Sequence, residues 1–374
     1  MQERLQKIRF TTPPTQNFST GLPARSARRT ASTDNKADSN RIIAPLFVHS
    51  LPWHRIEREQ ANHIAVALGE IGVMVSALRS EIANSDGYSA FHDAQSEPVN
   101  QPATETNQDV SSLPPLPLIV PYRPERYGLS IKDFASASVI DVRLTMHRDE
   151  TGRFAYSAEQ LARWDLSDSG HLISGGSWVP SSIFPPDVQG SGELKSKFSQ
   201  LRALAPKASI FVTLDPFHLR DDLPGVLANK PDGLIIRLDT ITSEGIELAT
   251  FVQKTRQMLD KYHGEEISLW IKPGDISPDD AAKLIALGAS GIAIDSWLNQ
   301  AWETIATASM KSGSFSSRAT YANNAGMLAD AMQDSIDRVF GLLDSLEKLP
   351  EDRRLTSLDQ KWCDELGLTS PSLP

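Results

Sequence analysis

Charged residues stand at the ends of several predicted strands, and their types make them the best candidates for chemistry in this sequence. Arg143, Asp239 and Lys272 are the candidate catalytic residues, and Asp295 ends a further predicted strand. Where parallel strands alternate with helices, ligands bind beyond the carboxyl ends of the strands. Lys272 and Arg143 would hold an anionic ligand there, with Asp239 or Asp295 as a general base. Alternatively, these charges pair with one another as salt bridges.

The stretch that must position these residues runs from Ala208 to Asn299 and alternates strands with helices. Its predicted strands are short apolar runs at Ile210–Leu214, Gly233–Arg237, Ser268–Lys272 and Gly291–Asp295. A helix start follows the third strand, with Ser277 as N-cap, Pro278 at the first helical position and acids in the first turn. That helix ends at Gly288. Continuous apolar strands between amphipathic helices indicate a parallel sheet covered by helices.

The rest of the chain supplies enough strands for a closed barrel. Further strands are predicted at Ile42–Val48, Gly72–Ser76 and Val139–Leu144, with a weak one at Leu172-Ile173. The total of about eight predicts a (β/α)8 barrel over residues 41–310. Residues 311–374 are predicted to form helices that pack on the barrel, because Ala325–Leu346 has a one-sided apolar stripe and Leu355–Leu366 forms a last short helix.

Two segments lack the composition of a packed fold. Residues 1–40 are basic, rich in Ser, Thr and Pro and poor in large apolar residues, which predicts a disordered tail; a transit peptide is the alternative. Residues 85–117 are long, polar and turn-rich, which indicates a disordered insertion within the barrel.

Composition restricts the classes of function. The chain has 374 residues and a net charge of −10, which argues against nucleic acid as a general partner. No apolar run approaches the roughly 18 residues of a membrane helix, so a membrane is not an expected partner. Cys363 is the only cysteine, which excludes an internal disulfide and an all-cysteine iron–sulfur or zinc site and favours a cytoplasmic location. The expected partners are a small anionic ligand or a protein.

Histidines give no further site. His49 and His54 follow the first predicted strand and are interpreted as ordinary loop residues. The sequence has no histidine spacing typical of a metal site and no recognisable nucleophile motif.

The order of segments resembles the FMN-binding central domain of glutamate synthase, of which this chain would be a divergent, stand-alone member. Segments that carry the resemblance are Pro45–Val48, Ala67–Gly72, Val139–Leu144, Leu269–Gly274 and Ala281–Asp295. The resemblance implies a TIM-type barrel, an oxidoreductase activity and FMN as cofactor. It places Lys272, Gly274 and Ser296 at the cofactor.

Several departures from this family argue against a bound flavin. Leu78–Glu81 and Leu238–Glu244 stand where the family has glycine-rich loops that let backbone approach the cofactor, and Thr213 stands where it has a flavin-facing lysine. The cysteines of the family's iron–sulfur cluster are absent.

The loop expected to bind the FMN phosphate is also changed. Pro273 lacks an N–H, and Asp275 and Asp295 would add carboxylates. Repulsion on the order of several kcal/mol would outweigh the about 0.3–2 kcal/mol of attraction at a helix N-terminus. We therefore expect no cofactor and a catalytically silent protein, a pseudoenzyme that binds a ligand or partner. The alternative is an FMN-dependent oxidoreductase with a site reshaped around Lys272, Gly274 and Ser296.

Overall fold

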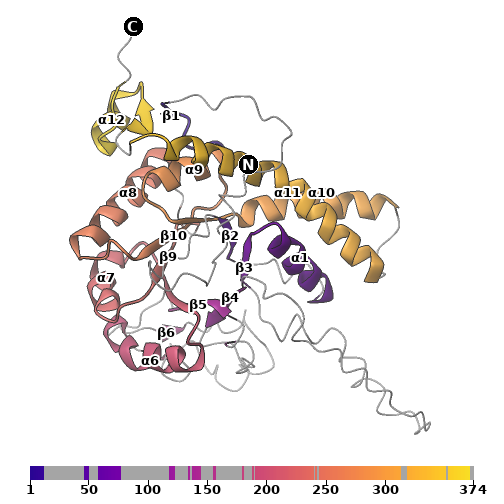
Figure 1. Cartoon of the computed structure of the whole chain (residues 1–374), viewed down its shortest axis with the longest axis horizontal. Helices are drawn as coiled ribbons and strands as arrows, with labels where there is room; N and C mark the ends of the chain where they lie inside the picture. The colour runs from indigo at the N-terminus through magenta and orange to yellow at the C-terminus, as the bar shows by residue number, and fades with distance from the viewer. Residues whose placement is uncertain are drawn as a thin grey trace.

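A closed barrel of eight parallel strands forms the centre of the molecule, with helices around it (Figure 1). The computed structural model describes residues 1–11, 46–49, 58–76, 118–122, 134, 137–144, 155–156, 179–180, 188, 190–239, 241, 244–312, 318–350 and 353–370. The predicted (β/α)8 fold is confirmed.

The strands follow the ring of the barrel in chain order. They are β2 (Leu46–Val48), β3 (Met74–Ser76), β4 (Leu118–Tyr122), β5 (Ala137–Arg143), β8 (Ser209–Leu214), β9 (Gly233–Arg237), β10 (Ser268–Lys272) and β11 (Gly291–Ala293). The last strand, β11, pairs in parallel with β2 and closes the ring.

One barrel strand differs from the sequence prediction. The strand that completes the ring is β4, paired with both β3 and β5, and it was not predicted. The weak strand expected at Leu172-Ile173 lies outside the described residues, as does the insertion at 85–117. Because Pro121 interrupts the short apolar run of β4 and cannot donate to a ladder, the run does not resemble a strand in sequence.

Helices cover the outside of the barrel. They are α1 (Arg58–Glu70), α6 (Leu194–Leu204), α7 (Leu219–Leu227), α8 (Gly245–Lys261), α9 (Pro278–Ala286) and α10 (Asp295–Ser312), with a 3-10 turn, η5 (Ser191–Glu193), before α6. The predicted start of α9 is confirmed: Ser277 Oγ accepts a hydrogen bond of 3.1 Å from the Asp280 N–H. Its end is set by Gly288, whose φ of 114° favours glycine.

The C-terminal segment adds one long helix and a small sheet. Helix α11 (Arg318–Glu347) contacts α1 and α9. It is followed by β12 (Leu355–Ser357) and α12 (Gln360–Leu366), so the last predicted helix begins five residues later than expected. Residues 355–357 are extended because they pair antiparallel with β1 (Ile8–Phe10), and Asp359 caps the helix by accepting from the Lys361 N–H at 3.1 Å.

The first eleven residues belong to the fold, which corrects part of the prediction of a disordered tail. Leu5 and Ile8 are fully buried, and β1 is hydrogen-bonded to β12 beside α12 (Figure 1). Two large apolar side chains help to dock this basic segment, although its average composition is polar. Residues 12–40 lie outside the described part.

A separate two-stranded sheet joins β6 (Ala155–Tyr156) to β7 (Val179–Pro180).

The interior of the barrel is closed by one apolar side chain from each strand. This floor consists of Phe47, Met74, Ile119, Val139, Phe211, Ile235, Trp270 and Ala293. The Trp270 ring lies 4.5 Å from the Phe47 ring and 4.4 Å from the Phe211 ring, measured between centroids. A second, larger core fills the space between the barrel and its helices. Among the helices in the described ranges, none is both long and apolar enough to cross a membrane.

Candidate functional site

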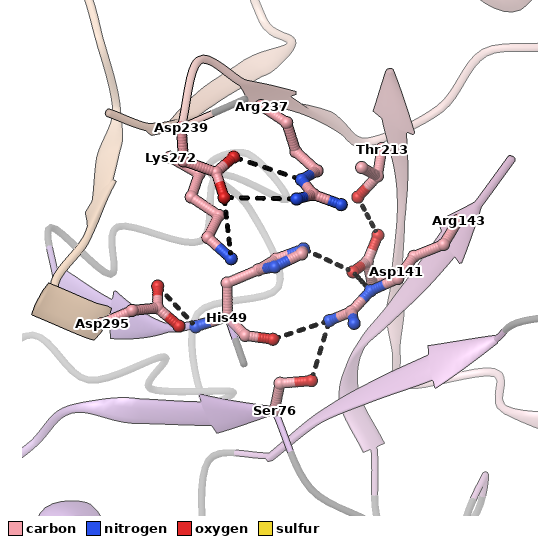
Figure 2. Close-up of polar contacts among 9 residues, drawn as sticks. All are labelled: His49, Ser76, Asp141, Arg143, Thr213, Arg237, Asp239, Lys272 and Asp295. Carbon is pink, nitrogen blue, oxygen red and sulfur yellow. Dashed lines mark hydrogen bonds and ion pairs between the residues drawn. The ribbon is translucent and has the colours of Figure 1, made fainter. Parts of the chain in front are cut away.

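A layer of polar side chains lies at the carboxyl ends of the strands (Figure 2). Side chains two positions apart on a strand share one face, so the residue two after each floor residue also faces the barrel interior. These residues are His49, Ser76, Pro121, Asp141, Thr213, Arg237, Lys272 and Asp295. All but Pro121 are polar, so the pattern that builds the floor also builds the site.

Asp141 is the acceptor that three side chains share. Its carboxylate is fully buried, pairs with Arg143 Nε, lies 3.2 Å from His49 Nε2 and accepts from Thr213 Oγ1 at 2.5 Å. Burial opposes ionisation of Asp141, but the Arg143 charge and the hydrogen bonds from His49 and Thr213 outweigh it. Together they hold the pKa of Asp141 far below its usual value, so the buried group is a carboxylate.

Arg143 ties three strands together around this carboxylate. Its Nη2 donates to the His49 carbonyl oxygen and to Ser76 Oγ, each at 2.9 Å (Figure 2). The His49 N–H donates in turn to Asp295 Oδ2 at 3.4 Å. His49 is only 1 % exposed, so the expectation that it is an ordinary loop residue is wrong. It enters the interior because it stands two positions after Phe47.

The imidazole of His49 is held neutral. Burial lowers its pKa most, the Arg143 charge lowers it further, and the Asp141 carboxylate opposes the shift without reversing it. A neutral, buried imidazole beside a carboxylate is poorly suited to exchange protons with a ligand.

This shift predicts a pH dependence of stability. Because the pKa of His49 is lower in the folded chain than the ordinary 6.5, the unfolded chain binds the extra proton first as pH falls. The contribution of the neutral His49 to the free energy of unfolding is complete above pH 6.5. Below pH 6.5 it is lost by up to about 1.4 kcal/mol per pH unit. Urea unfolding at pH 5.5, 6.5 and 7.5 should show a smaller slope for His49→Asn. The exposed His263→Asn is the control and should keep the wild-type slope; equal slopes in all three proteins would contradict the assignment.

A second cluster stands nearer the surface of the barrel mouth. Asp239 Oδ2 lies 3.4 Å from Lys272 Nζ and 3.2 Å from Arg237 Nη2. Burial tends to raise the pKa of Asp239, but the charges of Lys272 and then Arg237 lower it overall. The side chains of Lys272, Asp239 and Arg237 are 12 %, 20 % and 30 % exposed, so solvent reaches this cluster more readily than the Asp141 layer.

The structure thus brings the three predicted catalytic candidates to one end of the barrel but in two different settings. Arg143 is bound to the buried Asp141, whereas Lys272 and Asp239 pair with each other. These ion pairs correspond to the alternative left open by the sequence, in which the charges at the strand ends pair with one another as salt bridges. A joint grip on a ligand by Arg143 and Lys272 would require Arg143 to leave its carboxylate.

The residues expected at a cofactor also lie together. Gly274, in the loop after β10, has a φ of 83°, and Ser296 lies in the first turn of α10. Ser296 Oγ donates to the Gly274 carbonyl oxygen at 3.3 Å, which joins the ends of β10 and β11. Lys272 is next to this loop in sequence but is directed to Asp239 (Figure 2).

These residues do not fit the phosphate of FMN. The carbonyl of Pro273, which has no N–H, accepts from Arg4 Nη1 at 2.9 Å. The Ser296 hydroxyl already donates to a backbone carbonyl, and the Asp295 carboxylate stands at the N-terminus of α10, where a phosphate would otherwise meet free N–H groups. A carboxylate at that point repels a dianion.

Sequence reasoning missed His49, Ser76, Asp141 and Arg237 as members of the site. A usable signal is present, since each stands two positions after an apolar residue that faces the barrel interior. Within the described residues no group of three or more His, Cys, Asp or Glu side chains is placed to hold a metal ion.

Comparisons with known proteins concern the fold of the chain. Neither a family model nor a curated protein matches the sequence. Similar solved structures include mandelate oxidase with (S)-2-phenylpropionate, at 14 % identity and a TM-score of 0.45, covering 95 % of this chain and 87 % of that one. A flavocytochrome b2 double mutant with pyruvate bound matches at 13 % identity and a TM-score of 0.44, covering 88 % of this chain and 72 % of that one. A mandelate oxidase mutant with a C4a-OH-FMN adduct matches at 14 % identity and a TM-score of 0.40, covering 78 % of this chain and 74 % of that one.

Proposed function

We propose that this chain is a binding protein whose barrel mouth takes a small organic anion, a carboxylate or phosphate, at Lys272 and Arg237. One observation carries the proposal: two cationic side chains from the ends of neighbouring strands converge on the single carboxylate of Asp239, partly exposed to solvent.

The charges of both clusters favour ligand binding over catalysis. The Asp141–Arg143 pair is buried and balanced in charge, so it supports the mouth without competing for the ligand. Asp239, the nearest candidate base, has a lowered pKa, and a carboxylate that holds protons weakly is a poor general base. A catalytically silent relative of the glutamate synthase barrel has these properties.

The proposal is tested by replacing the lysine. Lys272→Met should weaken binding of pyruvate or inorganic phosphate, titrated calorimetrically, by about tenfold or more, because a charge-assisted contact is worth roughly 1.5–3 kcal/mol. Lys195→Met, on the exposed face of α6, should bind like the wild type. The proposal fails if the wild type takes up neither anion, or if Lys272→Met and Lys195→Met bind equally well.

A second candidate is an FMN-dependent oxidoreductase of the glutamate synthase type. It is favoured by the placement of Gly274 and Ser296 at the adjacent ends of β10 and β11, and we rank it second because of the poor fit to phosphate. FMN is the cofactor to test against this chain. The description of one mandelate oxidase structure names an FMN adduct.

A further inference from the structure

The first eleven residues, here called the N-terminal arm, lie across the starts of α8 and α9 at the mouth end of the barrel. The buried Asp280 carboxylate accepts the N–H of Arg4 at 2.6 Å and of Leu5 at 3.1 Å. Lys283 Nζ donates to the Leu5 carbonyl oxygen at 2.9 Å. Helix α9 therefore binds the backbone of the arm through Asp280 in its first turn and Lys283 in its last turn.

Helix α8 leaves room for this contact. A Cβ built on Gly245, the first residue of α8, would stand 1.8 Å from the Arg4 carbonyl oxygen. Any side chain at that position would displace the arm, so a glycine is required here by the close approach of backbone.

From this seat, Arg4 reaches the loop that carries the proposed ligand site. Its Nη1 donates to the carbonyl oxygen of Pro273 at 2.9 Å, and Pro273 stands between Lys272 and Gly274. The Lys272 carbonyl oxygen accepts the Leu238 N–H at 2.9 Å from the other side. Two successive carbonyls at the end of β10 are thus fixed, that of Lys272 by the residue after β9 and that of Pro273 by the arm.

We propose that Arg4 is a positioning residue of the anion site: it holds the loop after β10 so that Lys272 presents its ammonium group at the barrel mouth beside Asp239. This inference rests on the proposed function and adds to it a residue distant in sequence. Arg4 does not touch the ligand and acts through Pro273.

The arm should stay docked when the Arg4 side chain is removed. Asp280 binds backbone N–H groups, Leu5 and Ile8 are buried, and Ser357 Oγ donates to the Lys7 carbonyl oxygen at 2.8 Å. Since none of these contacts needs the guanidinium, positioning can be separated from folding.

The test compares Arg4→Ala and Arg4→Lys with Arg9→Ala, an exposed arm residue, as the matched control. Calorimetric titration with pyruvate gives the affinity, and hydrogen exchange at Gly274, Asp275 and Ile276 reports the loop. Arg4→Ala should weaken binding by about fivefold and speed exchange at these amides, with exchange in β5 unchanged. Arg4→Lys should restore part of both effects, and Arg9→Ala should match the wild type.

Two outcomes overturn the proposal, and they are distinguishable from failure of the binding function. If the wild type binds pyruvate and Arg4→Ala binds equally well, or exchange after β10 is unaltered, Arg4 has no positioning role although the anion site stands. If the wild type binds neither pyruvate nor phosphate, the anion site itself is wrong, whatever the exchange data show.

Discussion

Replacing Asp141 by asparagine should lower the free energy of unfolding by about 3–5 kcal/mol, the cost of breaking a buried ion pair. The carboxylate is fully buried and the Arg143 side chain is 8 % exposed, so the variant leaves a guanidinium charge inside the barrel without its counter-ion. Urea unfolding at pH 7, followed by tryptophan fluorescence, measures the loss. The double variant Asp141→Asn with Arg143→Met should recover part of it, because the stranded charge is then gone.

The control for this prediction is an ion pair at the surface. Asp279 contacts Arg338, with side chains 25 % and 48 % exposed, and Asp279→Asn should cost no more than about 1 kcal/mol. If Asp141→Asn and Asp279→Asn lose similar stability, the Asp141 layer does not organise the barrel end as described.

Replacing Trp270 by alanine should cost about 3–5 kcal/mol, since it opens a cavity in the barrel floor. Its indole ring is fully buried and packs against Phe47 and Phe211. Trp270→Phe should cost much less, about 1–2 kcal/mol. The buried indole N–H has no hydrogen-bond partner among the described residues, so phenylalanine also removes an unsatisfied polar group.

Thermal and urea unfolding of the two Trp270 variants would check this account of the floor. Equal losses for alanine and phenylalanine would mean that the ring's packing is not what stabilises the barrel interior. A gain of stability in Trp270→Phe would indicate that the buried, unsatisfied N–H destabilises the fold by more than the lost ring contacts stabilise it.

The second half of the barrel was the easier part to predict from sequence. The strands at Gly233–Arg237 and Ser268–Lys272 are apolar runs bounded by Pro, Gly or Asp, and the structure has them at the predicted bounds. The strand β4 was missed because its five residues include Pro121 and adjoin a long polar segment. Local patterning therefore identified these two strands, whose apolar runs are continuous.

The site was predicted less completely, because its contacts join residues far apart in the chain. Lys272 ends β10 and Asp239 stands two residues after β9, and strand ends are where ligands bind in this fold. Asp141 is flanked by Ile140 and Val142 in an apolar strand, so the local pattern predicts only a strand residue there. Its pairing with His49, 92 positions earlier, depends on the closed ring, which fixes which strand ends meet.

The N-terminal arm shows the same limit. Basic, polar composition predicts disorder for residues 1–40, but it averages over the two residues that dock the arm, Leu5 and Ile8. The sequence predicts the acids at the start of α9 as first-turn residues, and the structure has them there. Their partners are not visible in the sequence: Asp280 binds the arm, and Asp279 binds Arg338 of α11.

The visible spectrum of the freshly isolated protein, before and after an equimolar addition of FMN, tests most directly the proposal that the barrel mouth, whose charged side chains pair with one another, takes a small anion and no flavin. The account predicts no flavin absorption in the isolated protein and an added FMN spectrum identical to that of free FMN. A resident flavin in stoichiometric amount, or a one-to-one shift of the added FMN spectrum that is lost in Lys272→Met, would contradict it.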